Sequence, residues 1–235
     1  MVIQLGLNCQ PYFQLVNMDY EDILRRNMLV PLHPLGRGSF GCVYLVYHHK
    51  QKIVATKVIH IYLFDKGEID AQIELLKIKK MNIFVMKYVG YMTEGQYPIL
   101  LMEYANLNTL NIIAQQPQIT LPTCTLRALM KQILVGIQSF HSAGLVHSDI
   151  KLDNILLHSP PGSGRVHIKI SDFGLAKKVD LMSKQIRIAG TLLYMAPESL
   201  LHQANPTEKI DIYATGIVFY KLITHNYPVN INNIN

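Results

Sequence analysis

The chain has little of what defines several common protein classes. It has no tryptophan and only three cysteines, Cys9, Cys42 and Cys124, which are far apart and form no CxxC pair. This spacing predicts neither a zinc site nor a disulfide framework. Reduced, scattered thiols indicate a cytoplasmic protein.

Charge and long apolar runs are also scarce. Charged residues make up 16% of the chain and hydrophobic ones 49%, which excludes the composition of a disordered protein. No apolar run approaches the ~20 residues that span a bilayer, and the N-terminus lacks the basic region of a signal peptide. The net charge of +6 is spread along the chain, so we expect neither a nucleic-acid nor a membrane partner.

The first part of the chain predicts a β-rich unit behind an N-terminal extension, residues 1–30, which contains a short helix over 19–27. Residues 66–81 carry Ile69, Ile73, Leu76 and Lys80 at helical spacing with charges between them, so we expect an amphipathic helix. Four β-branched or apolar runs indicate strands, over residues 43–47, 53–59, 85–91 and 99–104.

The second part of the chain is predicted to be mainly helical. A polar stretch at 103–108 reads as a hinge, and apolar residues over 126–141 follow the i, i+3, i+4, i+7 pattern of a buried helix face that ends before Gly144. Two short strands, 155–157 and 166–170, and a second apolar helix, 211–222, are expected beyond it.

Three glycines, Gly36, Gly38 and Gly41, form a GxGxxG motif that is weak evidence by itself, because dinucleotide-binding folds use the same spacing. Here a strand follows the motif and no helix start is visible. We therefore expect a strand-turn-strand flap whose glycines let backbone amides approach phosphate. An isolated lysine is usually a surface charge, but Lys57, at the end of the next strand, is predicted to reach the nucleotide phosphates.

The octapeptide HSDIKLDN at 147–154 is followed by DFG at 172–174 and APE at 196–198. Phosphoryl transfer requires neutralised phosphate charge and an aligned hydroxyl, so positioning and electrostatics carry most of the catalysis. Asp149 has the chemistry to accept the hydroxyl proton and Lys151 to stabilise the transferring phosphoryl group. Two hard oxygen donors for Mg²⁺ are Asn154 and Asp172.

This ordered set of motifs resembles the eukaryotic protein kinase catalytic domain over residues 35 to about 228. The resemblance implies an α+β, bilobal fold. A small antiparallel β-sheet lobe with one main helix would occupy 31–102, a hinge 103–108, and a larger, mainly α-helical lobe 109–235. It implies ATP and Mg²⁺ as cofactors and Ser/Thr hydroxyls of proteins as acceptors.

The resemblance also assigns the nucleotide site. Met102 would be the gatekeeper, Val43 and Ala55 would cover adenine from above, and Leu156 would lie below it. The full set of nucleotide-binding residues is Leu35, Gly36, Gly38, Ser39, Gly41, Val43, Ala55, Lys57, Met102, Glu103, Ala105 and Leu156. His147 would pack on Phe173 rather than transfer protons. Lys151 and Thr191 favour serine/threonine over tyrosine as the acceptor.

Three features depart from the family pattern. Ser148 replaces the usual Arg, which makes this a non-RD sequence and removes the charge that a phosphate on the activation segment would meet. Gln72 stands where the family carries the Glu that pairs with the strand lysine. Glu74 is the predicted substitute partner of Lys57, with Glu68 as the alternative.

The third departure is length. Asp211 to Gly216 resembles the family's DxWxxG motif, with Tyr213 in place of Trp, and only 19 residues follow it. The last helices of the family are therefore expected to be missing, which would leave Glu198 without its usual Arg and a helix face uncovered. Lower stability, association with another chain and an incomplete sequence all fit, and the oligomeric state stays open.

The sequence thus favours an ATP-dependent protein serine/threonine kinase. A catalytically silent kinase-like module that binds nucleotide or partners is the alternative, because the helix Glu is uncertain and the end of the domain is absent. A nucleotide-binding oxidoreductase has only the GxGxxG motif in its favour and lacks the helix and acidic ribose ligand that such enzymes need.

Overall fold

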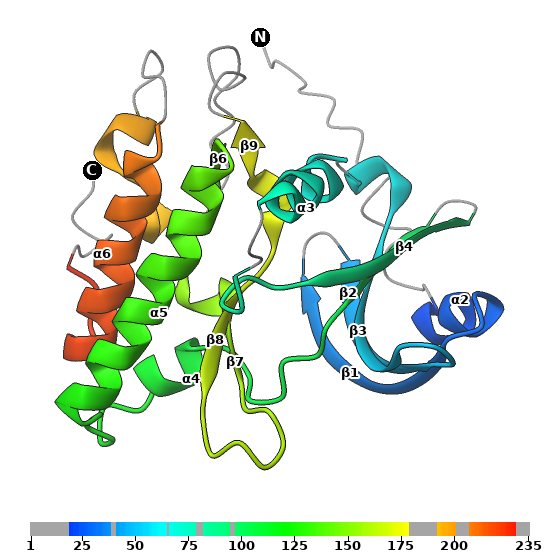
Figure 1. The fold of residues 1–235 in the computed structure, drawn as a ribbon, viewed down its shortest axis with the longest axis horizontal. Helices are drawn as coiled ribbons and strands as arrows, with labels where there is room; N and C mark the ends of the chain where they lie inside the picture. Colours follow the sequence, from blue (N-terminus) through cyan, green and yellow to red (C-terminus); the bar gives the residue numbers. More distant parts are fainter. Residues whose placement is uncertain are drawn as a thin grey trace, which may run out of the picture. The chain divides into compact units, whose positions relative to one another are not determined.

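The structure is a computed structural model (Figure 1) that describes residues 19–38, 41–64, 66–78, 82–94, 97–178, 192–200 and 207–228. The chain divides into two compact units. The first takes in Met1–Phe64 and Val89–Met102, and the second Asp65–Tyr88 and Glu103–Asn235. The break at 102/103 coincides with the start of the predicted hinge. Residues 65–88, however, group with the second unit and not with the predicted small lobe.

The first unit is built on an antiparallel five-stranded sheet of order β1-β2-β3-β5-β4. The strands are β1 Val30–Gly38, β2 Gly41–His48, β3 Lys52–Ile59, β4 Tyr88–Glu94 and β5 Tyr97–Met102. The four predicted strands are therefore confirmed, with shifted ends. The first strand of the predicted flap is present as β1, but it extends back over Pro31 and Pro34, which cannot donate to a ladder. It is accommodated as an edge strand whose register shifts next to both prolines.

One short helix, α2 Tyr20–Arg26, packs on the sheet of the first unit. Its N-cap, Asp19, accepts hydrogen bonds from two backbone N–H groups of the first turn, which satisfies donors that a helix start leaves unpaired. Tyr20 and Leu24 belong to the same buried cluster as Cys42 and Val46 of β2. The predicted helix is confirmed, but it is part of the first unit's core and not a separate extension.

The second unit is mainly helical, with α3 Gly67–Lys77, α4 Asn111–Ala114, α5 Thr123–Ser142 and α6 Lys209–Thr224. Two small hairpin-like sheets complete it, one of β7 Ile155–His158 and β8 His167–Ile170, the other of β6 Leu145–Val146 and β9 Lys177–Lys178. In Figure 1, α5 and α6 run side by side. The predicted long helices and the strand pair between them are confirmed, as is the α+β class.

The apolar residues of the two long helices are distributed differently. α5 buries Leu129, Ile133 and Ile137, as its periodicity predicts. α6 buries Val218 and Leu222 but exposes other apolar side chains, including Ile212, Tyr220 and Ile223. An uncovered apolar face on this helix was expected, and it is present. Among the described residues, no helix is long and apolar enough to cross a membrane.

The predicted helix over 66–81 is confirmed as α3, but its apolar residues are not its buried face. Ile73 and Leu76 are 47% and 53% exposed. The buried positions are instead Glu68, Ala71, Gln72 and Leu75. Apolar periodicity fails here because this helix buries polar side chains, and the reason for their burial becomes clear only at the site.

Candidate active site

One face of the sheet in the first unit gathers four of the predicted nucleotide-binding side chains. Val43 lies directly opposite Lys57 in the β2–β3 register, and Ala55 lies opposite Met102 in the β3–β5 register. Directly opposed residues share a face, as do residues two apart in a strand. These four side chains therefore lie on one face of the sheet, and the buried cluster that contains α2 lies on the other.

The glycine motif forms the tip of the β1–β2 hairpin, where Gly38 is paired with Gly41. Gly41 has φ +149°, and a Cβ there would lie 1.9 Å from the carbonyl oxygen of Val58, so only glycine fits. At Gly36 and Gly38 a Cβ would meet nothing within 4 Å. Glycine there leaves the backbone open to a ligand. Leu35 sits at a register shift of β1, and Ser39 lies outside the described residues.

The second unit holds the three predicted groups of the octapeptide within hydrogen-bonding distance of one another. Oδ2 of Asp149 accepts a hydrogen bond from Nζ of Lys151 at 2.7 Å and from Nδ2 of Asn154 at 2.9 Å. Asn154 also donates to the carbonyl oxygen of Asp149 at 2.9 Å. Both bonds to the Asp149 side chain fall on Oδ2, which orients the carboxylate without using Oδ1.

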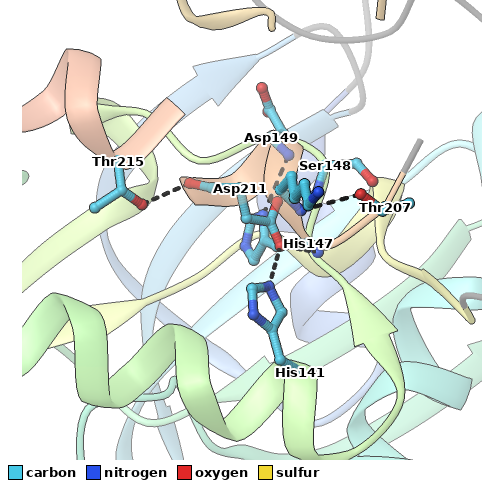
Figure 2. A network of polar contacts seen from close by, with 8 residues as sticks. His141, His147, Ser148, Asp149, Thr207, Asp211 and Thr215 are labelled. Atoms are coloured by element: carbon cyan, nitrogen blue, oxygen red, sulfur yellow. Dashed lines mark hydrogen bonds and ion pairs between the residues drawn. The ribbon is translucent and has the colours of Figure 1, made fainter. Parts of the chain in front are cut away.

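The loop that carries these groups is anchored by Asp211 at the start of α6 (Figure 2). Its carboxylate accepts the backbone N–H of His147 and of Ser148, each at 2.9 Å, and the Nε2–H of His141 at 3.0 Å. Asp211 is only 1% exposed, so water cannot replace it as an acceptor. The DxWxxG resemblance located this residue but did not reveal its contacts.

Ser148 is held in the left-handed region, with φ +67°. Such a backbone is strained for a residue other than glycine. Its N–H is bound by Asp211, while its Oγ is buried and has no hydrogen-bond partner among the described residues. The side chain that replaces the usual Arg therefore carries neither a charge nor a stabilising contact.

His147 is a structural residue, as the sequence predicted. Its ring is fully buried and lies edge-on to Phe173, with centroids 6.0 Å apart. Nδ1 accepts the N–H of Asp149 at 3.3 Å, and Nε2 is 3.1 Å from the carbonyl oxygen of Ser171, to which it donates. Both ring nitrogens are occupied by the backbone, so neither serves an incoming substrate.

The DFG segment is fixed through its phenylalanine and through the residue before it. Phe173 is fully buried and contacts the rings of Phe140 at 5.0 Å and Tyr88 at 5.1 Å. Ser171 donates both its N–H and its Oγ–H to the carbonyl oxygen of Asn154. Because Ser171 directly precedes Asp172, these bonds hold the backbone next to one predicted metal ligand against the backbone of the other, Asn154.

Amide and carboxylate oxygens are suitable donors for Mg²⁺, which is commonly held by one or two protein ligands together with phosphate oxygens and water. Asn154 and Asp172 fit this donor set. Because the Nδ2 group of Asn154 is committed to Asp149, the amide has a defined orientation. No group of three or more His, Cys, Asp or Glu side chains in the described part of the chain is arranged to hold a metal by itself.

The buried carboxylate of α3 is Glu68. It is 3% exposed, and its Oε1 accepts a short hydrogen bond from the phenol of Tyr88. Oε2 lies near Gly174 of the DFG segment, as does Oδ1 of Asp172. Burial and the negative charge of Glu68 raise the pKa of Tyr88 well above its ordinary value, so the phenol stays protonated and donates.

Glu74, the predicted partner of the strand lysine, has different surroundings. Its Oε2 is 2.8 Å from Nζ of Lys77, one turn along the same helix, in a pair whose lysine side chain is 64% exposed. The helix therefore presents Glu68 to the DFG segment and Glu74 to a surface ion pair. The sequence predicted Glu74 as the partner of Lys57 with Glu68 as the alternative, and which of the two pairs with Lys57 stays a prediction.

The predicted hinge residue Glu103 is also fixed within the second unit. Its Oε1 accepts from Nζ of Lys169 at 2.8 Å and from the N–H of Lys87 at 2.8 Å. Lys169 is opposite Leu156 in the β7–β8 register and is 8% exposed. Sequence reasoning missed Lys169, since a single lysine in a short strand gives no signal. Ala105 lies in the segment just after Glu103, and Thr191 lies outside the described residues.

The first unit carries a glycine hairpin and a strand lysine. The second unit carries an anchored aspartate loop that is followed by DFG. This combination is typical of folds that transfer phosphate. The model of the protein kinase domain matches residues 29–235. The chain therefore belongs to the protein kinase family.

Similar proteins carry serine/threonine-kinase names. The chain is 36% identical over 199 residues to the serine/threonine-protein kinase pakH of Dictyostelium discoideum, covering 83% of this chain and 37% of that protein. It is 30% identical over 203 residues to the human serine/threonine-protein kinase ULK1, covering 83% and 19%. It is 27% identical to KIC1 of Saccharomyces cerevisiae, covering 90% and 19%. The chain thus spans well under half the length of each of these relatives.

Proposed function

We propose that the protein transfers the γ-phosphate of ATP to serine or threonine hydroxyls of protein substrates. The observation that carries the proposal is the convergence of Lys151 and Asn154 on one oxygen of Asp149, in a loop fastened by the buried Asp211. A polar turn with no catalytic role would not need three oriented groups on a backbone held in a strained conformation.

The proposed roles combine the family resemblance with the contacts around Asp149. Asp149, oriented through Oδ2, accepts the hydroxyl proton at Oδ1, and the ammonium of Lys151 beside it offsets charge on the transferring phosphoryl group. Asn154 and Asp172 would hold Mg²⁺, which neutralises phosphate charge when bound. Lys57 and the glycine hairpin would hold the nucleotide phosphates, and Val43, Ala55 and Met102 the base. The remaining nucleotide-site residues keep the roles that the resemblance gives them.

The test is a radiolabelled assay with ATP, Mg²⁺ and a generic basic protein substrate, followed by identification of the phosphorylated amino acid. Label on serine or threonine is expected. The alternative, a silent nucleotide-binding module, would give thermal stabilisation by nucleotide without turnover. Label on tyrosine alone, or neither stabilisation nor turnover, would contradict the proposal.

We further propose Glu68, rather than Glu74, as the helix carboxylate that the family requires as partner of the strand lysine. Glu68 is buried beside Gly174 and bound by Tyr88, whereas Glu74 is engaged by the exposed Lys77. Catalysis would then depend on the first carboxylate and be insensitive to the second.

Glu68→Gln should lower kcat/KM by about 10- to 100-fold, because glutamine keeps the shape and an acceptor for Tyr88 but loses a charge-assisted contact. Glu74→Gln is the matched control on the same helix and should lower kcat/KM less than about twofold, since it removes the charge of a pair with the exposed Lys77. The measurement is steady-state kinetics of both variants at equal folded fraction. Larger damage from Glu74→Gln would restore the original assignment.

Activity should depend little on phosphorylation of the activation segment. Ser148 supplies no positive charge to meet a phosphate, and the loop is held by Asp211 instead. Phosphatase-treated protein should therefore keep activity within about tenfold of mock-treated protein. A larger loss would be expected only if the phosphate made charge-assisted contacts that the treatment removes. A loss of tenfold or more, reversed by rephosphorylation, would refute this.

We also propose a cytoplasmic signalling role with protein substrates. Support comes from the two described cysteines, Cys42 and Cys124, which are free thiols, and from the kinase names of the relatives. Fractionation of cells that express the chain with an epitope tag would test the compartment.

A further inference from the structure

The glycine hairpin has a single side chain between its first two glycines. Gly36 and Gly38 have no neighbour within 4 Å of where a Cβ would stand, so packing does not fix the backbone there. The residue between them is Arg37. Arg37 is therefore the side chain of this stretch itself that can hold it to the rest of the unit.

Arg37 belongs to the face of the sheet away from the predicted nucleotide side chains. It is opposite Cys42 in the β1–β2 register, while the neighbouring pair is Gly36 and Val43. Cys42 belongs to the buried cluster with α2, whereas Val43 shares its face with Lys57. The register directs Arg37 toward α2.

The guanidinium of Arg37 meets an aromatic ring of that helix. Its Cζ lies 5.8 Å from the centroid of the Tyr20 ring, within the range of a cation–π contact. A second tether lies beside it, since the thiol of Cys42 donates to the carbonyl oxygen of Gly36 at 3.3 Å. The hairpin tip is thus connected to the unit beneath it at two successive residues.

The ring that receives Arg37 is itself held firmly. Tyr20 is 7% and Leu24 0% exposed, and Asp19 caps the helix. At the other end, Asn27 Nδ2 donates to the carbonyl oxygen of Ile23 at 2.8 Å. Because capping and burial fix both ends of α2, Tyr20 is a stationary partner for a hairpin that packing does not hold.

We propose that α2 positions the glycine hairpin for nucleotide through the Tyr20–Arg37 contact. Tyr20 is then a positioning residue for ATP, acting through Arg37 from the opposite face of the sheet. The inference rests on the proposed function for its kinetic consequence. Its structural consequence, a hairpin held still before nucleotide arrives, does not depend on that function.

The kinetic test compares Arg37→Ala, Tyr20→Leu and Tyr20→Phe with wild type. The first two should raise the KM for ATP about threefold, the effect of losing a partly exposed cation–π contact, with kcat within about twofold. Tyr20→Phe keeps the ring but removes the phenol oxygen that also meets Arg37, so its KM for ATP should lie between those of wild type and Tyr20→Leu. The double variant Arg37→Ala with Tyr20→Leu should raise the KM for ATP no further than either single variant, because both substitutions remove the same contact.

The chain offers a matched control in Lys52, whose ammonium lies 5.9 Å from the Tyr47 ring at the other end of the same sheet. Lys52→Ala removes a cation–π contact of similar length that does not touch the hairpin, so it should leave the KM for ATP unchanged. An equal rise in KM for Lys52→Ala and Arg37→Ala would overturn the proposal, as would an unchanged KM in Arg37→Ala.

Amide hydrogen exchange in the nucleotide-free protein separates this inference from the proposed function. Exchange at Gly36, Arg37 and Gly38 should be about threefold faster in Arg37→Ala and Tyr20→Leu and unchanged in Lys52→Ala. If wild type neither binds nucleotide nor transfers phosphate, the proposed function fails while faster exchange still supports the contact. Unchanged exchange in Arg37→Ala would overturn the inference even in an active enzyme.

Discussion

Asp149→Asn should reduce phosphoryl transfer by about 10²–10⁴-fold, the contribution of a positioned general base. Asparagine keeps the size of the side chain and one oxygen able to accept from Lys151 or Asn154, so the loop should retain its shape. The loss should therefore fall on kcat, with nucleotide affinity and thermal stability close to wild type. Single-turnover transfer of radiolabelled phosphate measures it.

The control for this variant is Asp153→Asn, four residues farther along the same loop. Asp153 is exposed and accepts a hydrogen bond from Asn111 at 2.8 Å, so it has a similar polar environment but no contact with Asp149. Asp153→Asn should lower the rate of phosphoryl transfer less than about twofold, because it changes only an exposed polar contact. Equal incorporation of phosphate by wild type and Asp149→Asn would reject the enzyme and leave the silent module.

Asp211→Ala should be the most destabilising single change outside the apolar core, by about 3–5 kcal/mol in the free energy of unfolding. Two buried backbone N–H groups and a histidine N–H lose their acceptor at once. Activity should fall as well, by about 10²-fold in protein that remains folded, because the loop carrying Asp149 loses its anchor. Denaturant unfolding and kinetics of the folded fraction measure the two effects.

Asp211→Asn tests whether the charge or merely an acceptor is needed. Its two carboxylate oxygens receive one N–H each from His147 and Ser148, so an amide must turn its NH₂ group toward one of these donors. We expect most of the destabilisation to persist. Ser148→Gly in this background should recover about 1 kcal/mol, because glycine tolerates the left-handed backbone at φ +67°. No destabilisation in Asp211→Ala would show that the network is not an anchor.

Much of the fold could be predicted from the sequence because its elements obey local rules. β2 and β3 are β-branched, α5 has an uninterrupted 3.6-residue apolar period, and Asp19 marks a helix start. The extent of β1 was not predicted because its two prolines argue against a strand, and its place at the sheet edge makes them acceptable.

The site was predictable where function depends on residues close together in sequence. Asp149, Lys151 and Asn154 lie within one loop, so their spacing alone indicated that they would meet. The sequence offered Glu68 as the alternative to Glu74, but its surroundings could not be found in this way. Its burial depends on Tyr88 and Gly174, which are far from it in sequence, and a buried polar side chain violates the apolar pattern used to orient α3.

The sequence by itself determined which chemical groups are available and the order in which they occur, since motif spacing and strand or helix periodicity are local properties. Only the tertiary structure decided which of two glutamates faces the DFG segment, what holds the strained Ser148, and which face of the sheet Arg37 points to. Each of these depends on contacts between segments distant along the chain, such as α6 with the catalytic loop, or on a strand register. No local pattern encodes those contacts.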